Sequence, residues 1–197
     1  MKKPERNYLY PVFLKLHELD VLIVGGGNVA LEKIHFILKS SPRARISVVA
    51  PDIREEVYQL VLDYPDAKVT FLNKPFVRAD LDGHDVVIAA TSIRQVNLEV
   101  HRAAKAKGIL INVADTPELC DFYMGAIVTK GNIKLGISTN GSSPTLAKRL
   151  REYFEETLPD EIDDLANNLN KYRKLIAKSK FADKVRQLNT LTEKLIQ

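Results

Sequence analysis

The sequence has a single cysteine among its 197 residues, which excludes an intrachain disulfide and a CxxC metal or redox pair. Its four histidines are scattered, with no HxxxH or HxH spacing, so we expect no resident metal site. No apolar run approaches the ~20 residues of a membrane-spanning helix, and the charged N-terminus lacks the apolar core of a signal peptide. We therefore expect a soluble, cytoplasmic protein with no membrane partner.

The sequence also lacks a strong excess of one charge, since it has 29 basic and 25 acidic residues and a net charge of +4. The bases gather near the C-terminus, where residues 171–197 hold eight bases and two acids. That segment carries no nucleic-acid recognition motif, so a solvated helix face is favoured and no nucleic-acid partner is expected. With 45% hydrophobic residues, the chain is long enough to bury a core without cross-links.

Short apolar, β-branched runs alternate with amphipathic segments over the first 115 residues. Strands are expected at 19–24, 46–50, 68–72, 85–90 and 109–113, and helices at 29–39, 53–62 and 97–107. Runs that are apolar throughout are typical of parallel strands covered by helices on both faces. The sequence therefore predicts an α/β fold, a Rossmann-type doubly wound parallel sheet.

The alternation ends near residue 115. The pair Gly131-Asn132 is typical of a two-residue hairpin turn, and Ser143 before Pro144 is a typical helix start. The expected elements are strands at 126–130 and 133–138 and helices at 144–157, 162–176 and 181–195. We predict three domains: a nucleotide-binding domain over 1–115, a hairpin segment over 116–143 and a small helical domain over 144–197.

A glycine-rich stretch, residues 25–30, directly follows the first predicted strand. Gly25, Gly27 and Ala30 match G-x-G-x-x-A, the dinucleotide-binding fingerprint, in the required place between a strand and a helix. The first glycine permits the tight turn, the second lets the backbone approach a pyrophosphate, and the helix N-terminus offers its amides to the phosphates. This context favours dinucleotide binding over an ordinary glycine-rich turn.

Polar residues follow other predicted strands, whose carboxyl ends form the ligand-binding edge of such a sheet. Asp52, behind Pro51, could hold the adenosine ribose or cap the next helix. Arg54 could meet the extra phosphate of NADP, so these residues alone leave the cofactor open. Thr91 and Ser92 could face the cofactor or only cap the following turn.

Asp115 follows the fifth predicted strand, at the same edge. A carboxylate beside a nicotinamide is placed to take or give a proton. The pattern equally allows Asp115 to shape the turn before Pro117. Nearby Cys120 fits a small buried hydrophobe better than a nucleophile.

A polar loop over residues 138–145 leads into the helix that begins at Pro144. Its hydroxyls, its amides and the bases that follow could bind carboxylates or phosphates, although an ordinary cap with solvated bases is slightly favoured on pattern alone. The candidate residues are Ser138, Asn140, Gly141, Ser142 and Lys148.

Taken together, these segments resemble the precorrin-2 dehydrogenase family, which includes the N-terminal module of siroheme synthase. The matching segments are residues 10–14, 21–33, 48–52, 112–115, 120–123 and 137–147. Two positions depart from the family pattern: Gly125 stands where proline is usual, and Glu32 stands where a base is common. Both departures affect local geometry more than chemistry.

The resemblance implies NAD-dependent oxidation of precorrin-2, a tetrapyrrole with eight carboxylates, to sirohydrochlorin in sirohaem biosynthesis. In some members it also implies insertion of ferrous iron, a ferrochelatase activity. It implies that Asn28, Val29, Pro51 and Asp52 contact NAD and that Asp115 is the catalytic carboxylate.

For the rest of the chain, the resemblance implies that the hairpin segment builds a homodimer and that the C-terminal helices cover the substrate. A non-enzymatic, NAD-sensing regulatory module is the alternative. That alternative explains the glycine motif and the alternating pattern, but not the polar loop or the helical end.

Overall fold

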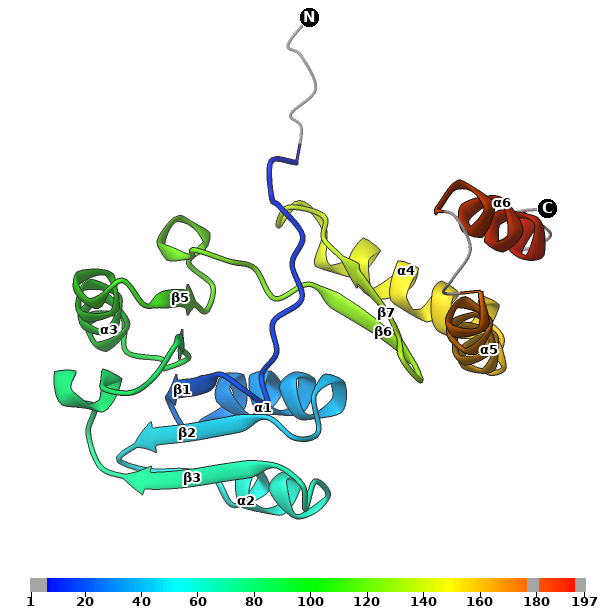
Figure 1. Cartoon of the computed structure of the whole chain (residues 1–197). Helices are drawn as coiled ribbons and strands as arrows, with labels where there is room; N and C mark the ends of the chain where they lie inside the picture. The colour runs from blue at the N-terminus through cyan, green and yellow to red at the C-terminus, as the bar shows by residue number, and fades with distance from the viewer. Residues whose placement is uncertain (1–6, 177–180, 194–197) are drawn as a thin grey trace, which may run out of the picture. The chain divides into compact units, whose positions relative to one another are not determined.

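The computed structural model describes residues 7–176 and 181–193 (Figure 1). These residues divide into two compact units. The first runs to Gly125 and also includes Ser138–Ser142, and the second comprises Ala126–Ile137 and the chain from Ser143 onward.

The first unit contains a five-stranded, fully parallel sheet. Its strands are β1 (Asp20–Val24), β2 (Arg45–Ala50), β3 (Lys68–Asn73), β4 (Val86–Ala89) and β5 (Leu110–Val113). They lie in the order β3-β2-β1-β4-β5, so the direction of strand addition reverses at β1. This order confirms the predicted doubly wound sheet.

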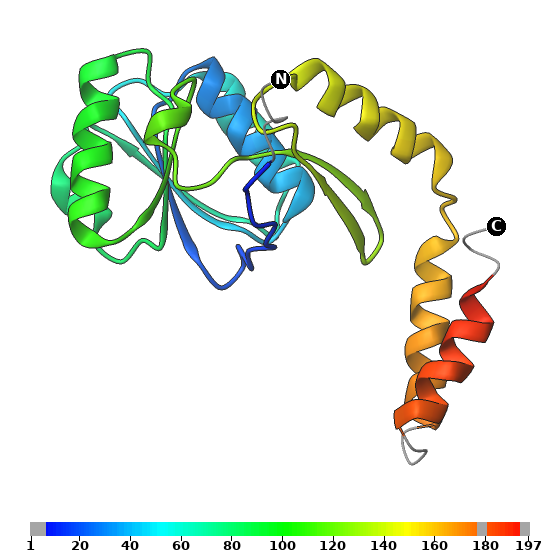
Figure 2. The same ribbon diagram turned by 90° about the horizontal axis from the view of Figure 1, so that it is seen from above.

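Helices cover both faces of this sheet, because its central strands are apolar on both sides. Along β1, Val21 and Ile23 pack into the cluster formed with α1 (Asn28–Ser40) and α2 (Glu55–Leu62). The alternate residues Leu22 and Val24 pack with α3 (Arg94–Lys107) on the other face. Figures 1 and 2 show the resulting three layers.

Most element boundaries lie within two residues of the predicted ones, and two helix starts are instructive. Helix α3 begins at Arg94 and not at 97, because the Thr91 hydroxyl accepts a hydrogen bond from the Ile93 amide (3.1 Å) and so organises the turn before the helix. Helix α2 begins at Glu55, with Arg54 as its N-cap residue in an extended conformation. The predicted start at 53 is therefore wrong by two residues.

The second unit pairs a hairpin with helices. Strands β6 (Ala126–Lys130) and β7 (Ile133–Ile137) are antiparallel around the predicted Gly131-Asn132 turn. Helix α4 (Pro144–Thr157) packs against the hairpin, and the Ser143 hydroxyl caps it by accepting a hydrogen bond from the Leu146 amide (3.1 Å).

Helix α5 (Ile162–Leu175) is joined to the hairpin turn by polar contacts. Asp163 Oδ1 accepts hydrogen bonds from the amide (2.7 Å) and the side chain (2.9 Å) of Asn132, and Lys130 forms an ion pair with Asp160. Gly131 has a φ of +55°, and a Cβ there would lie 2.2 Å from Asp163 Cγ. The turn therefore requires glycine for both conformation and space.

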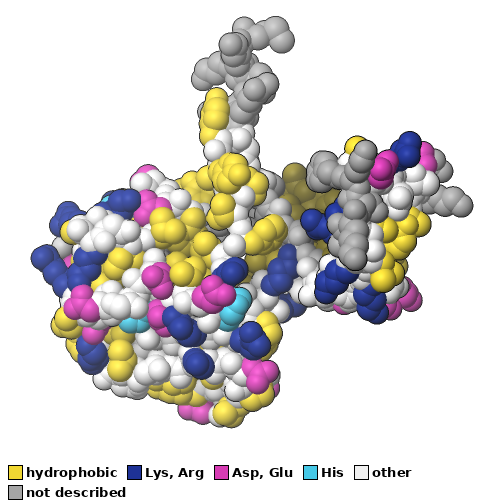
Figure 3. Space-filling view, in the orientation of Figure 1, with side chains coloured by type: hydrophobic (Ala, Val, Ile, Leu, Met, Phe, Trp, Pro, Cys, Tyr) yellow, Lys and Arg dark blue, Asp and Glu magenta, His cyan; other side chains and the backbone are white. Residues whose placement is uncertain are grey.

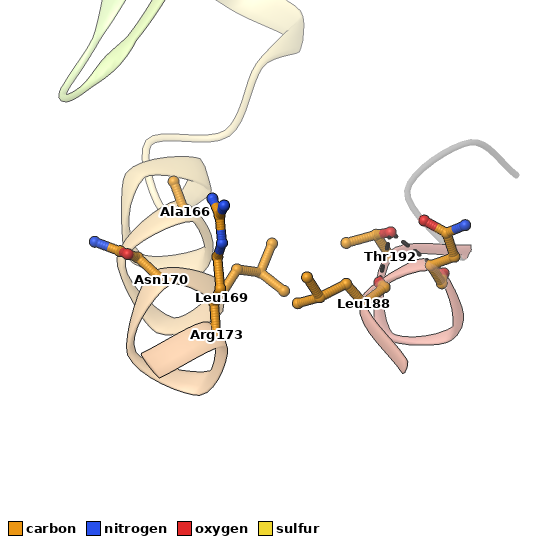
Figure 4. Close-up of a pocket in the computed structure, with 7 residues that line it drawn as sticks. Ala166, Leu169, Asn170, Arg173, Leu188 and Thr192 are labelled. Carbon is orange, nitrogen blue, oxygen red and sulfur yellow. Dashed lines mark hydrogen bonds between the residues drawn. The ribbon is translucent and has the colours of Figure 1, made fainter. Parts of the chain in front are cut away.

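Helix α6 (Phe181–Thr192) runs beside α5. Leu169 and Leu188 point toward each other across a pocket between the two helices (Figure 4). The Tyr172 hydroxyl donates a hydrogen bond to Gln187 (3.0 Å). The last predicted turn, beyond residue 193, lies outside the described residues. None of the described helices is both long and apolar enough to span a membrane.

Candidate functional site

The carboxyl ends of β1, β2, β4 and β5 meet at one edge of the sheet. Gly25 donates its amide to Val49 of β2 (2.9 Å), and Ala90 donates to Val24 of β1 (2.8 Å). Ala114 in turn donates to Ala89 of β4 (2.9 Å). The segments that contain the predicted residues Gly25, Pro51, Thr91 and Asp115 therefore follow the strands at the same edge of the sheet.

The three glycines after β1 have different roles. A Cβ at Gly25, whose φ is +130°, would lie 2.4 Å from the Ala90 carbonyl oxygen, and one at Gly26 would lie 2.3 Å from the Asp52 carbonyl oxygen. Both are buried in the fold itself. Gly27 is exposed, has an ordinary extended backbone, and would place a Cβ in open space. Only at Gly27 is the space left for a ligand.

Helix α1 offers its N-terminus at this point. Gly27 is its N-cap residue, and within the described chain no side chain caps the helix and no acid lies in its first turn. Its first amides therefore remain available, and the positive end of the helix dipole is not neutralised by its own sequence. Asn28 is exposed beside them, Val29 is half-buried, and Ala30 is fully buried against the sheet. The site fits a pyrophosphate.

The loop from β2 to α2 lies beside the glycine turn. Pro51 and Asp52 are exposed, and the Arg54 amide donates to the Gly26 carbonyl (3.0 Å). The alternative in which Asp52 caps α2 is wrong, because Arg54 is the N-cap residue. The Arg54 guanidinium donates to the Asn28 side chain and pairs with Glu56.

Thr91 is tied into the turn after β4 by Asn97, which sequence reasoning missed. Asn97 is only 8% exposed. Its Oδ1 accepts from the Thr91 hydroxyl (2.7 Å) and amide (3.2 Å), and its Nδ2 donates to the Thr91 carbonyl (2.9 Å). The Thr91 hydroxyl is thus engaged within the turn, while its backbone lies against Gly25. Ser92 beside it is exposed.

Asp115 lies immediately past the end of β5. It is exposed, and its φ of +55° puts it in the left-handed region, which Asp and Asn tolerate better than most residues. Strand β4 separates β5 from β1. At the usual spacing of neighbouring strands, the end of β5 therefore lies roughly 10 Å from the glycine turn, on the side away from β2.

Cys120 braces the turn that carries Asp115. Its thiol accepts a hydrogen bond from the Val113 amide (3.2 Å) and lies within hydrogen-bonding distance of the carbonyls of Val113 (3.2 Å) and Thr116 (3.4 Å). Buried Asn112 donates to the Phe122 carbonyl (2.9 Å) in the same segment. Burial raises the pKa of the Cys120 thiol, which agrees with the expectation that it is not a nucleophile.

The polar loop 138–142 belongs to the first unit. Asn140 (φ +54°) and Gly141 (φ +77°) are successive left-handed residues, and Ser142 closes the turn by donating its amide to Thr139 (3.0 Å). Asp115 and Asn140 are the two non-glycine residues with positive φ among those described. Such conformations concentrate at functional sites.

Lys148 lies in α4, in the second unit. It is exposed, and its ammonium is 3.8 Å from Glu152, which also pairs with Arg149 and Arg151. Part of the positive charge predicted near this loop is therefore balanced within the helix. Across residues 7–176 and 181–193, no group of three or more His, Cys, Asp or Glu side chains is arranged to hold a metal ion.

Residues 12–126 match a family described as putative NAD(P)-binding. The chain belongs to this family. A second family, described as the sirohaem biosynthesis protein central region, matches residues 130–157. The two matches cover the glycine turn, Asp115 and the polar loop, and they confirm the resemblance stated from the sequence.

Similar proteins agree with this assignment. The siroheme synthase of Nitrosomonas europaea is 39% identical over 92% of this chain, and that of a Psychrobacter species is 40% identical over 80%. The chain spans about a third of the length of these relatives (35% and 31%). A solved structure, SirC, precorrin-2 dehydrogenase, matches with a TM-score of 0.75 at 28% identity, over 93% of this chain and 89% of that one.

Proposed function

We propose that the chain is an NAD-dependent precorrin-2 dehydrogenase, which oxidises precorrin-2 to sirohydrochlorin in sirohaem biosynthesis. The observation that carries this proposal is the position of Asp115, exposed and left-handed at the end of β5, two strands from a glycine turn with open space at Gly27. The likeness to SirC and to the siroheme synthases identifies the substrate we propose.

NAD would lie along the carboxyl edge of the sheet. The amides at the start of α1 would hold its pyrophosphate, with Gly25 and Gly27 shaping the turn and Asn28, Val29 and Ala30 forming the first helical turn. Pro51 and Asp52, on the β2 side, would hold the adenosine half. The nicotinamide half would then extend past Thr91 and Ser92 toward Asp115.

NAD⁺ supplies the acceptor for the hydride that leaves precorrin-2. Asp115 takes the accompanying proton, as a general base held at a fixed place by its turn. Cys120 hydrogen-bonds backbone groups on both sides of Asp115 and so braces the turn that carries the carboxylate. The oxidation would balance, because bound NAD⁺ would accept the two electrons as a hydride and Asp115 would accept the proton.

The polar loop and the start of α4 are proposed to bind substrate carboxylates. Ser138, Asn140, Gly141 and Ser142 would offer hydroxyl, side-chain amide and backbone donors, and Lys148 a charge. Precorrin-2 is polyanionic, so such donors suit it. In this proposal, residues 1–115 bind the cofactor, residues 116–143 form the dimer contact and residues 144–197 cover the substrate.

A homodimer and a cytoplasmic location complete the proposal. Apolar side chains stand exposed along residues 8–14, with Tyr8 at 89% and Tyr10 at 86% exposure, and Figure 3 shows hydrophobic surface on this segment. The β6–β7 hairpin also has no further strand on either edge among the described residues. Open edges and exposed apolar side chains both favour association with a second copy.

The decisive experiment incubates the protein with NAD⁺ and precorrin-2 and follows the tetrapyrrole absorption spectrum. A dehydrogenase converts the spectrum to that of sirohydrochlorin in step with NADH formation. A regulatory module would bind NAD⁺ and leave the spectrum unchanged, which would refute the proposal. Repeating the assay with ferrous iron as a substrate tests the ferrochelatase activity.

A further inference from the structure

We infer that Glu56 is a specificity-determining residue that keeps the site selective for NAD over NADP by pairing with Arg54 and so offsetting the charge that would attract a 2′-phosphate. The inference rests on the proposed binding of NAD at the glycine turn. It concerns a pair of residues in the loop that follows β2, outside the fingerprint itself.

Arg54 is the cation that this loop presents beside the cofactor site. Its backbone amide is hydrogen-bonded to Gly26 (3.0 Å), and its guanidinium donates to the side chain of Asn28 in the first turn of α1. The loop after β2 is where doubly wound dinucleotide sites distinguish the two cofactors: an acid there binds a ribose 2′-hydroxyl, and an arginine accommodates a 2′-phosphate. This loop contains one of each, Asp52 and Arg54.

Glu56 determines whether Asp52 or Arg54 sets the cofactor preference of the site. Its carboxylate receives two hydrogen bonds from the Arg54 guanidinium, from Nε (3.1 Å to Oε2) and from Nη2 to Oε1. Together with the bond to Asn28, this geometry occupies three nitrogens of the fork. Arg54 lowers the pKa of Glu56 to about 2, so the pair stays ionised throughout the physiological range. Glu56 therefore offsets the charge of the arginine that would attract a 2′-phosphate, and Asp52 sets the preference.

Calorimetric titration with NAD⁺ and NADP⁺ separately tests this inference on the intact chain. Glu56→Gln removes the charge that holds Arg54 while keeping the size of the side chain. We expect the ratio of NADP⁺ to NAD⁺ affinity to rise roughly 1.5- to 5-fold, the range of an ion pair at an exposed site. The gain should shrink as salt is raised, because the contact is screened.

Glu55→Gln is the matched control. Glu55 is also exposed, precedes Glu56 in the first turn of α2, and accepts a hydrogen bond from Gln59 (2.8 Å). Its substitution makes the same change of charge in the same place without releasing Arg54. If the two variants shift the affinity ratio equally, general charge and not the Arg54 contact sets it, and the inference is overturned.

A second control combines Glu56→Gln with Arg54→Gln. In that background the gain for NADP⁺ should disappear, because no cation is left to release. If Glu56→Gln strengthens both cofactors alike, Arg54 reaches their shared pyrophosphate, and the specificity role is refuted. If the wild-type chain binds neither cofactor, the proposed function itself fails. Binding of NAD⁺ with an unchanged ratio in the variant overturns the inference alone.

Discussion

Substituting Gly27 by valine should block cofactor binding without changing the stability of the fold. The backbone of Gly27 (φ −90°, ψ −163°) suits any residue, and a Cβ there meets nothing within 4 Å. The new side chain would therefore fit the protein but fill the space that a pyrophosphate needs. Gly25→Ala is its counterpart, because a Cβ at Gly25 meets the backbone of Ala90 at 2.4 Å and the φ is +130°.

The two substitutions should differ in stability. Valine is a poorer N-cap residue than glycine, and this difference destabilises the protein by up to about 1 kcal/mol. Valine also reduces the conformational freedom of the unfolded chain, which stabilises the folded protein by roughly 0.4–1 kcal/mol. The net change for Gly27→Val is thus close to zero. Gly25→Ala combines positive-φ strain of about 1–3 kcal/mol with a backbone overlap. A chain of this size loses about 2–4 °C of melting temperature per kcal/mol of destabilisation. The melting temperature of Gly25→Ala should therefore fall by roughly 5 °C or more.

Thermal unfolding with and without NAD⁺ measures both effects. Ligand at about 100 times its Kd stabilises the native state by roughly 2.7 kcal/mol, or roughly 5–10 °C. We expect this shift in the wild type and in Gly136→Val, a control whose Cβ in β7 also meets open space. Gly27→Val should keep the wild-type melting temperature and lose the shift. A full NAD⁺ shift in Gly27→Val would show that the cofactor does not approach this turn.

Four further predictions concern other parts of the chain. Asp115→Asn, which keeps the left-handed conformation, should lower precorrin-2 turnover by about 10²–10⁴-fold with NAD⁺ affinity unchanged; near-normal turnover would make Asp115 a turn residue only. Because burial raises the pKa of Cys120, its alkylation by iodoacetamide should be slow near pH 8 and still be accelerating above pH 9, whereas a plateau below pH 9 would contradict this. Gly131→Ala should destabilise the hairpin by at least about 1–2 kcal/mol, as hydrogen exchange of residues 126–137 would show, because its Cβ meets Asp163 and its φ is positive. Hydrogen bonds from Asn132 lower the pKa of Asp163 below its usual 3.8, so the stability this contact adds is present above that pH and is lost as the pH falls through the lower folded value; hairpin exchange that does not accelerate there would argue against the contact.

The central strands of the sheet were predictable because they are apolar on both faces. Val21 to Val24 need no knowledge of their neighbours to be identified as a buried parallel strand. The start of α3 was not predictable in the same way, since its N-cap residue is Ile93, an apolar residue, and no side-chain hydrogen bond caps the helix. The Thr91 hydroxyl instead accepts from the Ile93 amide in the turn before the helix. Capping rules search for a polar N-cap residue, so they cannot find a helix start of this kind.

The candidate site divides similarly. The glycine fingerprint and the strand-end position of Asp115 are sequence signals, and the structure places both at one edge. Asn97 left a weaker signal: it is a polar residue in helical register with buried Val100 and Ala104, which suggests a buried hydrogen-bonding role. The pair formed by Arg54 and Glu56 left none, because residues two apart do not face each other on a helix. They meet only because Arg54 is still extended (φ −60°, ψ 143°) before α2 begins.

The division of the chain into two units has a consequence for how it can be cut. The backbone passes from one unit to the other after Gly125, after Ile137 and after Ser142. Cleavage at any one of these crossings divides the linear chain into two fragments with no covalent bond between them. After cleavage at Gly125, only noncovalent packing of residues 138–142 in the first unit would hold the fragments together. A fragment that stops at Gly125 loses the polar loop, whereas one that stops at Ser142 keeps the first unit whole. Truncations intended to test the helical end should begin from that second boundary.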